Sequence, residues 1–365
     1  MTIGTRPEAI KLMPVIRALE NRGAGPMVFL TGQHQELLDP TLEALGISAT
    51  EDLNLMQPSQ SLASLSARVL TGMQELLQRH RPRMLVVQGD TTTVSMAALA
   101  AFYEDVPVAH VEAGLRTGVA RNPFPEELNR KLVACIAGLH FAPTPRAREN
   151  LLRENVPAEK IHLVGNTAID ALFLCRDRVI SRAPGAAVAE LLRLDRSLVL
   201  VTAHRRESFG EDMVAIIRGV ARLATALHDS IRVVFPVHLN PSVQSVAREL
   251  LGGIPNVRLL EPLSYLDFVA VLLRARLIIT DSGGLQEEAA ALGVPVLVVR
   301  RTTERPEAIE AGVAELVGPD EDRIFEAGRL LLCDPTAHSH RAIPTDVFGD
   351  GQAAERIAQV ICATG

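Results

Sequence analysis

The amino-acid sequence predicts an α/β protein with two domains, each built on a doubly wound parallel sheet. Three observations predict this fold class. Short runs rich in Val, Ile and Leu alternate with helical patterns along the whole chain, which is typical of repeated strand–helix–strand units. Nearly all of these runs are continuously apolar, as in strands that helices bury on both faces. The length of 365 residues suits two or three domains of ~100–200 residues each.

The expected strands form two series, and helical patterns lie between them. The first series follows a short strand before Gly4 and comprises residues 27–31, 84–89, 106–112, 139–142 and 162–164. The second series comprises residues 198–203, 231–237, 257–260, 277–281, 295–299 and 314–317. Helices are expected at 62–79, 126–136, 212–227 and 284–292. The segment 181–187 is rich in small residues and includes Pro184 and Gly185, so we place a domain boundary near 166–190.

Composition and missing motifs argue against several classes of protein. The net charge of −6 disfavours a nucleic-acid-binding protein, and no apolar run approaches the ~20 residues of a membrane span. None of the three lysines follows a glycine, so the sequence has no Walker A loop. It also lacks Cys-x-x-Cys, His-Glu-x-x-His and Gly-x-Ser-x-Gly motifs, which disfavours a zinc site and a serine nucleophile. We therefore expect a cytoplasmic protein without a metal ion, with its four cysteines as buried thiols.

Three acidic residues of the N-terminal half follow strands or open a helix. Asp90 comes directly after a buried strand, where it either caps the next helix or serves catalysis at a strand tip. Glu112 ends the next strand and shares one face of it with His110, although a histidine there also suits a buried core. Glu126 follows two prolines at a helix start, where the helix dipole alone would favour an acid. These acids are the candidates for proton transfer.

Basic residues near the first helix suit an anion. Arg6 and Lys11 lie close to the helix start that follows Gly4, with Pro7 at its opening. The alternative is an ordinary strand–helix turn that carries surface charges.

The C-terminal half contains two further candidate anion sites. His204 and Arg205 follow the first strand of the second series, which suits a phosphate but is also compatible with an exposed charged turn. The turn Ser282-Gly283-Gly284 lies between a buried strand and a helix, where free N–H groups suit a diphosphate. Glu288 lies one to two helical turns further and suits ribose hydroxyls, and Arg305 follows the next strand. A plain turn also explains the two glycines.

The motifs in this order resemble one known family over essentially the whole chain. They are GTRPEAIK at 4–11, GDTTT at 89–93, HVEAGLRT at 110–117, PEELN at 125–129, GNTAID at 165–170, HRRESFG at 204–210, PVHLNP at 236–241, DSGGLQEE at 281–288 and TTERPE at 302–307. The chain resembles the bacterial non-hydrolysing UDP-N-acetylglucosamine 2-epimerases. The resemblance implies the GT-B architecture, with two Rossmann-like domains and UDP in the cleft between them. It gives an N-terminal domain at 1–167, a C-terminal UDP-binding domain at 168–351, and a last helix at 352–365 that packs back on the first domain.

The resemblance also implies roles for individual residues. The catalytic residues of the family fall on Asp90, Glu112, Glu126 and His204. The residues that contact the substrate and its UDP group fall on Arg6, Lys11, Ser282, Gly283, Gly284, Glu288 and Arg305. A second, activating UDP-sugar would bind near Gln33, His34, Arg205 and His238. The family further suggests a homodimer and a reaction that needs no cofactor.

The implied reaction is epimerisation at C2 of UDP-N-acetylglucosamine. Departure of UDP from C1 makes the C2 proton removable, so the enzyme must stabilise the diphosphate and hold a carboxylate near C2. The sequence leaves open which acid is the base. It also leaves open a hydrolysing epimerase that releases N-acetylmannosamine, an epimerase of a modified UDP-amino sugar, a GT-B glycosyltransferase, and a sensor that only binds UDP-sugars.

Overall fold

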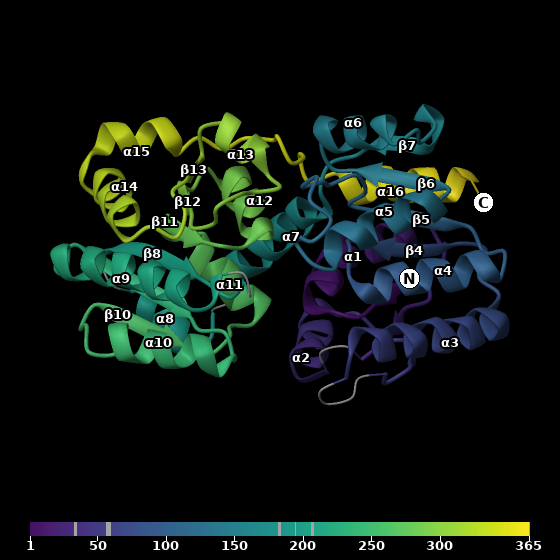
Figure 1. Cartoon of the computed structure of the whole chain (residues 1–365), viewed down its shortest axis with the longest axis horizontal. Coiled ribbons are helices and arrows are strands. Elements are labelled where there is room, and N and C mark those ends of the chain that lie inside the picture. The colour runs from purple at the N-terminus through teal and green to yellow at the C-terminus, as the bar shows by residue number, and fades with distance from the viewer. Residues whose placement is uncertain (33–34, 56–59, 182–183, 194, 206–207, 365) are drawn as a thin grey trace. The chain divides into compact units, whose positions relative to one another are not determined.

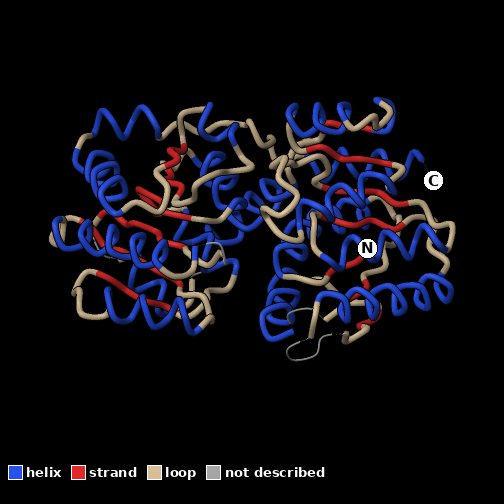
Figure 2. Tube along the Cα trace, viewed as in Figure 1, coloured by secondary structure: helices blue, strands red, loops and turns tan. Residues whose placement is uncertain are grey.

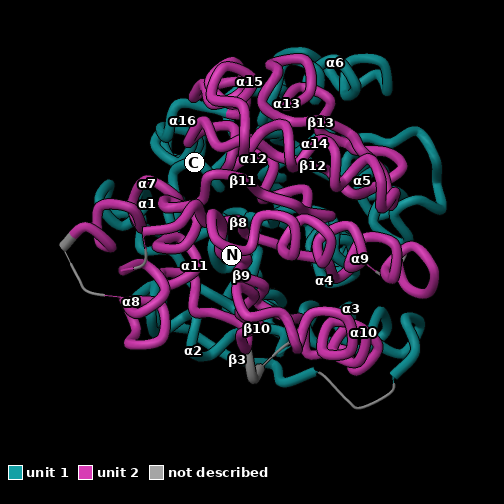
Figure 3. The backbone as a smooth tube through the Cα atoms, turned by 90° about the vertical axis from the view of Figure 1, so that its left-hand side faces the viewer, with its two compact units in different colours: residues 1–171, 349–365 teal, residues 172–348 magenta. Residues whose placement is uncertain are grey.

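The structure, a computed structural model, describes residues 1–32, 35–55, 60–181, 184–193, 195–205 and 208–364. The chain divides into two compact units, which Figure 3 colours separately. The first unit comprises residues 1–171 and 349–365, and the second comprises residues 172–348. The sequence places these limits at 167/168 and 351/352 instead.

The first unit contains seven described strands in two parallel sheets. One sheet has the order β1 (Thr2–Ile3), β2 (Phe29–Leu30), β3 (Glu51–Asp52). The other has the order β4 (Leu85–Gln88), β5 (Val108–Val111), β6 (Leu139–Ala142), β7 (Ile161–Leu163). Its helices are α1 (Arg6–Asn21), α2 (Gln35–Leu45), α3 (Leu62–His80), α4 (Thr92–Tyr103), α5 (Glu126–Ile136), α6 (Pro145–Arg153) and α16 (Ala353–Thr364), with a short 3-10 turn at Ala158–Lys160. Figure 1 labels most of these elements.

The second unit contains a six-stranded parallel sheet of the order β10-β9-β8-β11-β12-β13. Its strands are β8 (Ser197–Thr202), β9 (Ile231–Pro236), β10 (Val257–Leu260), β11 (Ala275–Thr280), β12 (Val296–Val298) and β13 (Ala314–Leu316). Helix α7 (Thr167–Ser181) crosses the limit between the units. The other helices of this unit are α8 (Ala186–Leu192), α9 (Glu211–Ala226), α10 (Pro241–Leu251), α11 (Tyr265–Leu272), α12 (Gly283–Leu292), α13 (Pro306–Glu310), α14 (Glu321–Cys333) and α15 (Pro335–Arg341). Figure 2 shows this alternation of helices and strands.

The strand order of the second unit fixes where a ligand can bind. Numbered along the unit, the order is 3-2-1-4-5-6, the Rossmann arrangement, and it reverses between β8 and β11. Ligands of such sheets bind outside the carboxyl ends of the strands at this switch point. The loops that follow β8 and β11 contain His204 and Ser282, so the candidate anion residues of this half lie at the switch point.

The buried cores explain why the strands read as continuously apolar. On one face of the second sheet, alternate residues of β8, β9 and β11 pack in one cluster with α9, α10 and α14. The opposite-facing residues of the same strands, such as Leu200 and Val234, are also buried. In the first unit, α3 and α4 pack on β4 and β5 in a similar cluster. Helices thus cover both faces of the second sheet, as the sequence predicts.

The C-terminal helix belongs to the first unit. Asp170 accepts a hydrogen bond of 2.8 Å from the Ala354 backbone N–H, and the Arg356 guanidinium donates one of 3.0 Å to the Val164 carbonyl. Helix α16 also packs on α1.

The prediction of four buried cysteines is wrong. Cys175 is buried, but Cys135, Cys333 and Cys362 are exposed, because each lies near the end of a helix whose apolar side faces elsewhere. None of the helices in the described part of the chain is long and apolar enough to cross a membrane.

Candidate functional site

Asp90 and Glu112 lie at adjacent strand ends in the first unit. They follow β4 and β5, which pair in register so that Gln88 lies beside Val111. The Glu112 carboxylate accepts hydrogen bonds of 2.8 and 2.6 Å from the Lys11 ammonium, and another from the Gln88 side-chain amide. Its backbone has a φ of +64°, a conformation that bulky L-residues rarely adopt and that concentrates at functional sites. The tertiary structure thus brings Lys11 to Glu112, which the sequence does not reveal.

The Asp90 carboxylate is held by a residue of α5. Its Oδ2 atom accepts from Arg130 Nε at 2.8 Å and lies 2.7 Å from Arg130 Nη2. The same buried guanidinium donates to Glu127 at 3.1 Å. Glu126 is the first residue of α5, so Arg130 connects the Asp90 loop to the helix that carries the third predicted acid. Sequence reasoning missed Arg130 because its only local signal is an arginine one helical turn after Glu126.

Glu8 is a further acid in this cluster, and it is almost fully buried. Its carboxylate accepts backbone N–H bonds from Gly4 at 2.6 Å and Thr5 at 3.1 Å, and a bond of 2.7 Å from the Thr91 hydroxyl. Burial raises the pKa of Glu8 to about 7, although these hydrogen bonds oppose the shift. Thr5 and Glu8 have the spacing of a capping box in the sequence, and in the structure they form one.

His110 is a buried core histidine. Its Nε2 atom donates to the Gly89 carbonyl at 2.8 Å, and the ring is 1% exposed. Burial lowers the pKa of His110 to about 3, so the imidazole is neutral at physiological pH. The ring therefore fixes the turn that precedes Asp90, and of the two interpretations the sequence left open, the structural one holds.

Arg6 is the first residue of α1 and is partly buried. It stands directly after the Gly4–Thr5 segment that Glu8 holds. Gln33 and His34, which were predicted to bind an activator, lie outside the described residues.

In the second unit, His204 lies beside a fully buried carboxylate. Asp281 Oδ2 accepts the backbone N–H groups of His204 and Arg205, each at 2.7 Å. Asp281 Oδ1 lies 3.3 Å from His204 Nδ1. The His204 ring stacks on the His238 ring, with centroids 5.9 Å apart and an angle of 17° between the planes. The three residues join the loops that follow β8, β9 and β11 at the switch point.

The Ser282-Gly283-Gly284 turn opens α12 as predicted. Ser282 is the N-cap residue but its side chain makes no capping bond, so the first N–H groups of the helix remain suited to an anion. A Cβ on Gly283 would lie 2.8 Å from Arg305 Nη1, so glycine lets the guanidinium approach the helix start closely. Arg305 therefore packs directly on the helix start that the sequence predicts as a diphosphate site.

Buried acids hold Arg305 in this position. Its Nε donates to Glu287 at 2.8 Å, and its Nη1 lies 2.7 Å from Glu304. Glu304 also accepts from Arg300 at 2.7 Å and lies 3.7 Å from the Arg205 guanidinium. The predicted ribose acid, Glu288, accepts from the Tyr265 hydroxyl at 2.6 Å. Glu287 and Glu304 were missed as site residues, because only the fold brings them to Arg305.

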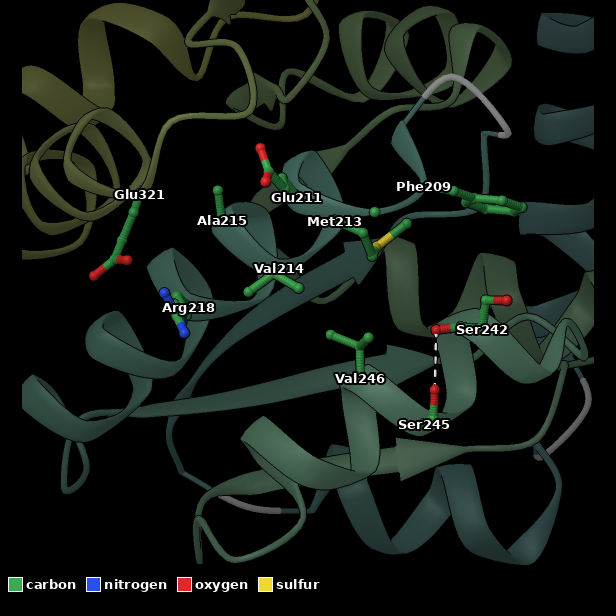
Figure 4. A pocket seen from close by; sticks show the side chains of 11 residues that line it. Phe209, Glu211, Met213, Val214, Ala215, Arg218, Ser242, Ser245, Val246 and Glu321 are labelled. Atoms are coloured by element: carbon green, nitrogen blue, oxygen red, sulfur yellow. Dashed lines mark hydrogen bonds between the residues drawn. The ribbon is translucent and has the colours of Figure 1, made fainter.

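A separate cavity of about 850 Å³ lies in the second unit, between residues of α9 and α10 (Figure 4). It is lined by Phe209, Met213, Val214 and Val246, among others, with Arg218 as its cation. It includes none of the predicted site residues. Among the described residues, no group of three or more His, Cys, Asp or Glu side chains could hold a metal ion.

The fold and the site together indicate the class of protein. A Rossmann sheet with an anion-suited helix start at its switch point is typical of proteins that bind nucleotides, and the chain divides into two α/β units as the predicted GT-B architecture requires. The family model for UDP-N-acetylglucosamine 2-epimerase matches residues 17–362. The chain therefore belongs to the UDP-N-acetylglucosamine 2-epimerase family, whose members are isomerases.

Individual relatives agree with this assignment. The UDP-N-acetylglucosamine 2-epimerase of Salmonella typhimurium is 47% identical over 363 residues, which cover 98% of this chain and 96% of the relative. The crystal structure of the Neisseria meningitidis UDP-GlcNAc 2-epimerase bound to UDP-GlcNAc has a TM-score of 0.93 and 39% identity, covering 99% of this chain and 98% of that chain. The Methanocaldococcus jannaschii UDP-GlcNAc 2-epimerase in complex with UDP-GlcNAc and UDP has a TM-score of 0.86 and 34% identity, covering 99% of this chain and 98% of that chain.

Proposed function

We propose that this chain interconverts UDP-N-acetylglucosamine and UDP-N-acetylmannosamine without hydrolysing them. The observation that carries the proposal is the pair of carboxylates, Asp90 and Glu112, on adjacent strand ends of the first unit, in a chain whose relatives act as UDP-GlcNAc 2-epimerases. Both carboxylates accept hydrogen bonds from donors on other elements, Arg130 at Asp90 and Lys11 with Gln88 at Glu112, which hold each proposed proton carrier in place.

The proposed reaction has two halves. In the elimination, the C1–O bond to UDP breaks, a carboxylate removes the C2 proton, and a C1–C2 double bond forms to give 2-acetamidoglucal. In the re-addition, the UDP oxygen bonds to C1 and a proton is delivered to the opposite face of C2. Asp90, Glu112 and Glu126 are the proposed proton carriers.

The diphosphate is assigned to residues of the second unit. Ser282 and the backbone N–H groups of Gly283 and Gly284, with Arg305 packed on the same helix start, are proposed to supply donors and positive charge where the leaving group gains negative charge. His204 and Arg6 are proposed to add to this stabilisation, and Glu288 to bind the ribose.

Regulation and assembly also belong to this proposal. Arg205 and His238 are assigned to a second UDP-sugar that activates the enzyme, together with Gln33 and His34. We further propose that the enzyme is a homodimer in the cytoplasm.

Proton NMR with UDP-N-acetylglucosamine in D₂O tests the reaction. The expected result is UDP-N-acetylmannosamine with deuterium at C2. Release of free N-acetylmannosamine and UDP would instead identify a hydrolysing enzyme, and an unchanged spectrum from protein that binds UDP would refute the proposal for this substrate.

Glu112→Gln tests the role of the carboxylate. We expect turnover to fall by roughly 10²–10⁴-fold while UDP binding, measured by calorimetry, stays close to wild type. Asp90→Asn should behave in the same way. Glu20→Gln, at the exposed end of α1, is the matched control, and wild-type turnover in both site variants would refute the assignment.

A further inference from the structure

Asp281 is a buried acid at the switch point to which neither the sequence nor the proposed reaction gives a role. Its side chain is 0% exposed, so its charge must be compensated inside the protein. Two consecutive backbone N–H groups, of His204 and Arg205, do this at 2.7 Å each, and both bind the same oxygen, Oδ2. Asp281 thereby fixes the backbone of the residue proposed to meet the leaving diphosphate.

The second carboxylate oxygen of Asp281, Oδ1, has a different hydrogen-bonding environment. Oδ1 is buried and makes no hydrogen bond with the described residues, and His204 Nδ1 lies 3.3 Å from it. A buried carboxylate oxygen without a donor is costly. A proton on His204 Nδ1 would supply a donor to this oxygen.

The neighbouring ring supports this arrangement. His238 Nδ1 accepts the Asn240 backbone N–H at 3.1 Å, so Nδ1 of His238 carries no proton. His238 covers one face of the His204 ring by stacking. The His204 side chain is nevertheless 40% exposed, which leaves Nε2 as the ring nitrogen that can reach a ligand.

We propose that Asp281 is a positioning residue that keeps His204 protonated on Nδ1 and presents Nε2 to the leaving diphosphate. This inference rests on the proposed function. With the carboxylate on one nitrogen and the diphosphate on the other, the ring donates from both nitrogens as an imidazolium. Its positive charge then stabilises UDP as the C1–O bond breaks, in the way a buried aspartate orients and supports a catalytic histidine in hydrolases.

The tautomer of His204 tests the proposal without any need for activity. In wild-type protein labelled with ¹⁵N-histidine, we expect the His204 signal, assigned by its loss in His204→Gln, to show a proton on Nδ1. Asp281→Asn places an amide donor beside Nδ1 and should move the proton to Nε2. A wild-type ring that is protonated only on Nε2 would overturn the proposal, whether or not the variant folds.

Steady-state kinetics then distinguish a role of Asp281 in positioning His204 from a role in stabilising the fold alone. Asp281→Asn should lower kcat by roughly 10²–10⁴-fold while KM changes less than threefold, because a neutral ring can still donate to the diphosphate from Nε2. Asp320→Asn removes a carboxylate that caps α14 outside the site and serves as the matched control. If a folded Asp281→Asn variant keeps the wild-type kcat, the positioning role of Asp281 is overturned and the proposed function stands. If the wild-type protein shows the expected tautomer but is inactive, the proposed function is overturned instead.

Discussion

At the scale of single residues, the predicted acids and bases depend on partners far away in the sequence. Glu112 is bound by Lys11, 101 residues earlier, and Asp90 by Arg130, 40 residues later. These charge-assisted hydrogen bonds fix the direction of each carboxylate. Glu8 differs, since it sits among neutral donors and its burial is not offset by a cation. The cluster therefore combines two carboxylates that are paired with cations and one acid, Glu8, whose pKa is raised to about 7 by burial.

Glu8 should make the stability of the protein depend on pH. The pKa of Glu8 rises from 4.5 to about 7 on folding, so between these values the folded chain holds a proton that the unfolded chain has released. The free energy of unfolding then falls as the pH rises through this window. Glu8→Gln removes the titration and keeps an acceptor for Gly4 and Thr5. We expect the difference in the free energy of unfolding, variant minus wild type, to rise by up to about 3 kcal/mol between pH 4.5 and 7.

Urea denaturation at a series of pH values measures this effect. Glu20→Gln, the same change on the exposed end of the same helix, provides the reference profile. A Glu8→Gln profile parallel to wild type would contradict the shifted pKa of Glu8.

At the scale of elements, the site depends on tight connections between strands and helices. The loop after β5 carries Glu112 and runs into Gly114, whose φ is +91° and whose Cβ position is occupied by the Ala147 carbonyl of α6. Asn150 of α6 also donates to the Gly114 carbonyl at 3.0 Å. The loop is thus held against α6 by a contact that only glycine permits.

Two glycines in this loop allow a matched test. Gly118 also has a positive φ, of +79°, but nothing lies within 4 Å of its Cβ position. Gly118→Ala should cost about 1–2 kcal/mol of stability from backbone strain alone. Gly114→Ala adds a collision with backbone, so we expect a clearly larger loss and lower turnover through displaced Glu112. Thermal denaturation and kcat measure both, and equal losses in the two variants would contradict the close approach of α6.

At the scale of the whole molecule, the chain leaves the first unit after residue 171 and returns to it at residue 349. Helix α16 completes the first unit, since Ile357 is fully buried in it and α16 packs on α1. The second unit has its own core around β8, β9 and β11. A destabilising substitution should therefore weaken the whole unit that contains it, including segments far away in the sequence, and leave the other unit largely unchanged.

Ile357→Ala tests this organisation. The cavity should cost about 2–5 kcal/mol and raise hydrogen exchange throughout residues 1–171 while leaving residues 172–348 little changed. Ile343→Ala, at a site that is 57% exposed in the second unit, should change stability by only about 0.5 kcal/mol. Faster exchange limited to residues 172–348 in Ile357→Ala would contradict the division.

The sequence by itself determined the α/β class, because strands covered on both faces must be continuously apolar. It also determined that Asp90, Glu112, His204 and Ser282 follow buried strands or open helices, because strand ends and helix starts have local signals. It did not determine the burial of the cysteines, since three of the four face solvent. Only the tertiary structure decided that Lys11 meets Glu112, that Glu287 and Glu304 hold Arg305, and that Asp281 faces His204. These contacts join segments that are distant along the chain, and the order in which the strands pair decides which of their ends become neighbours.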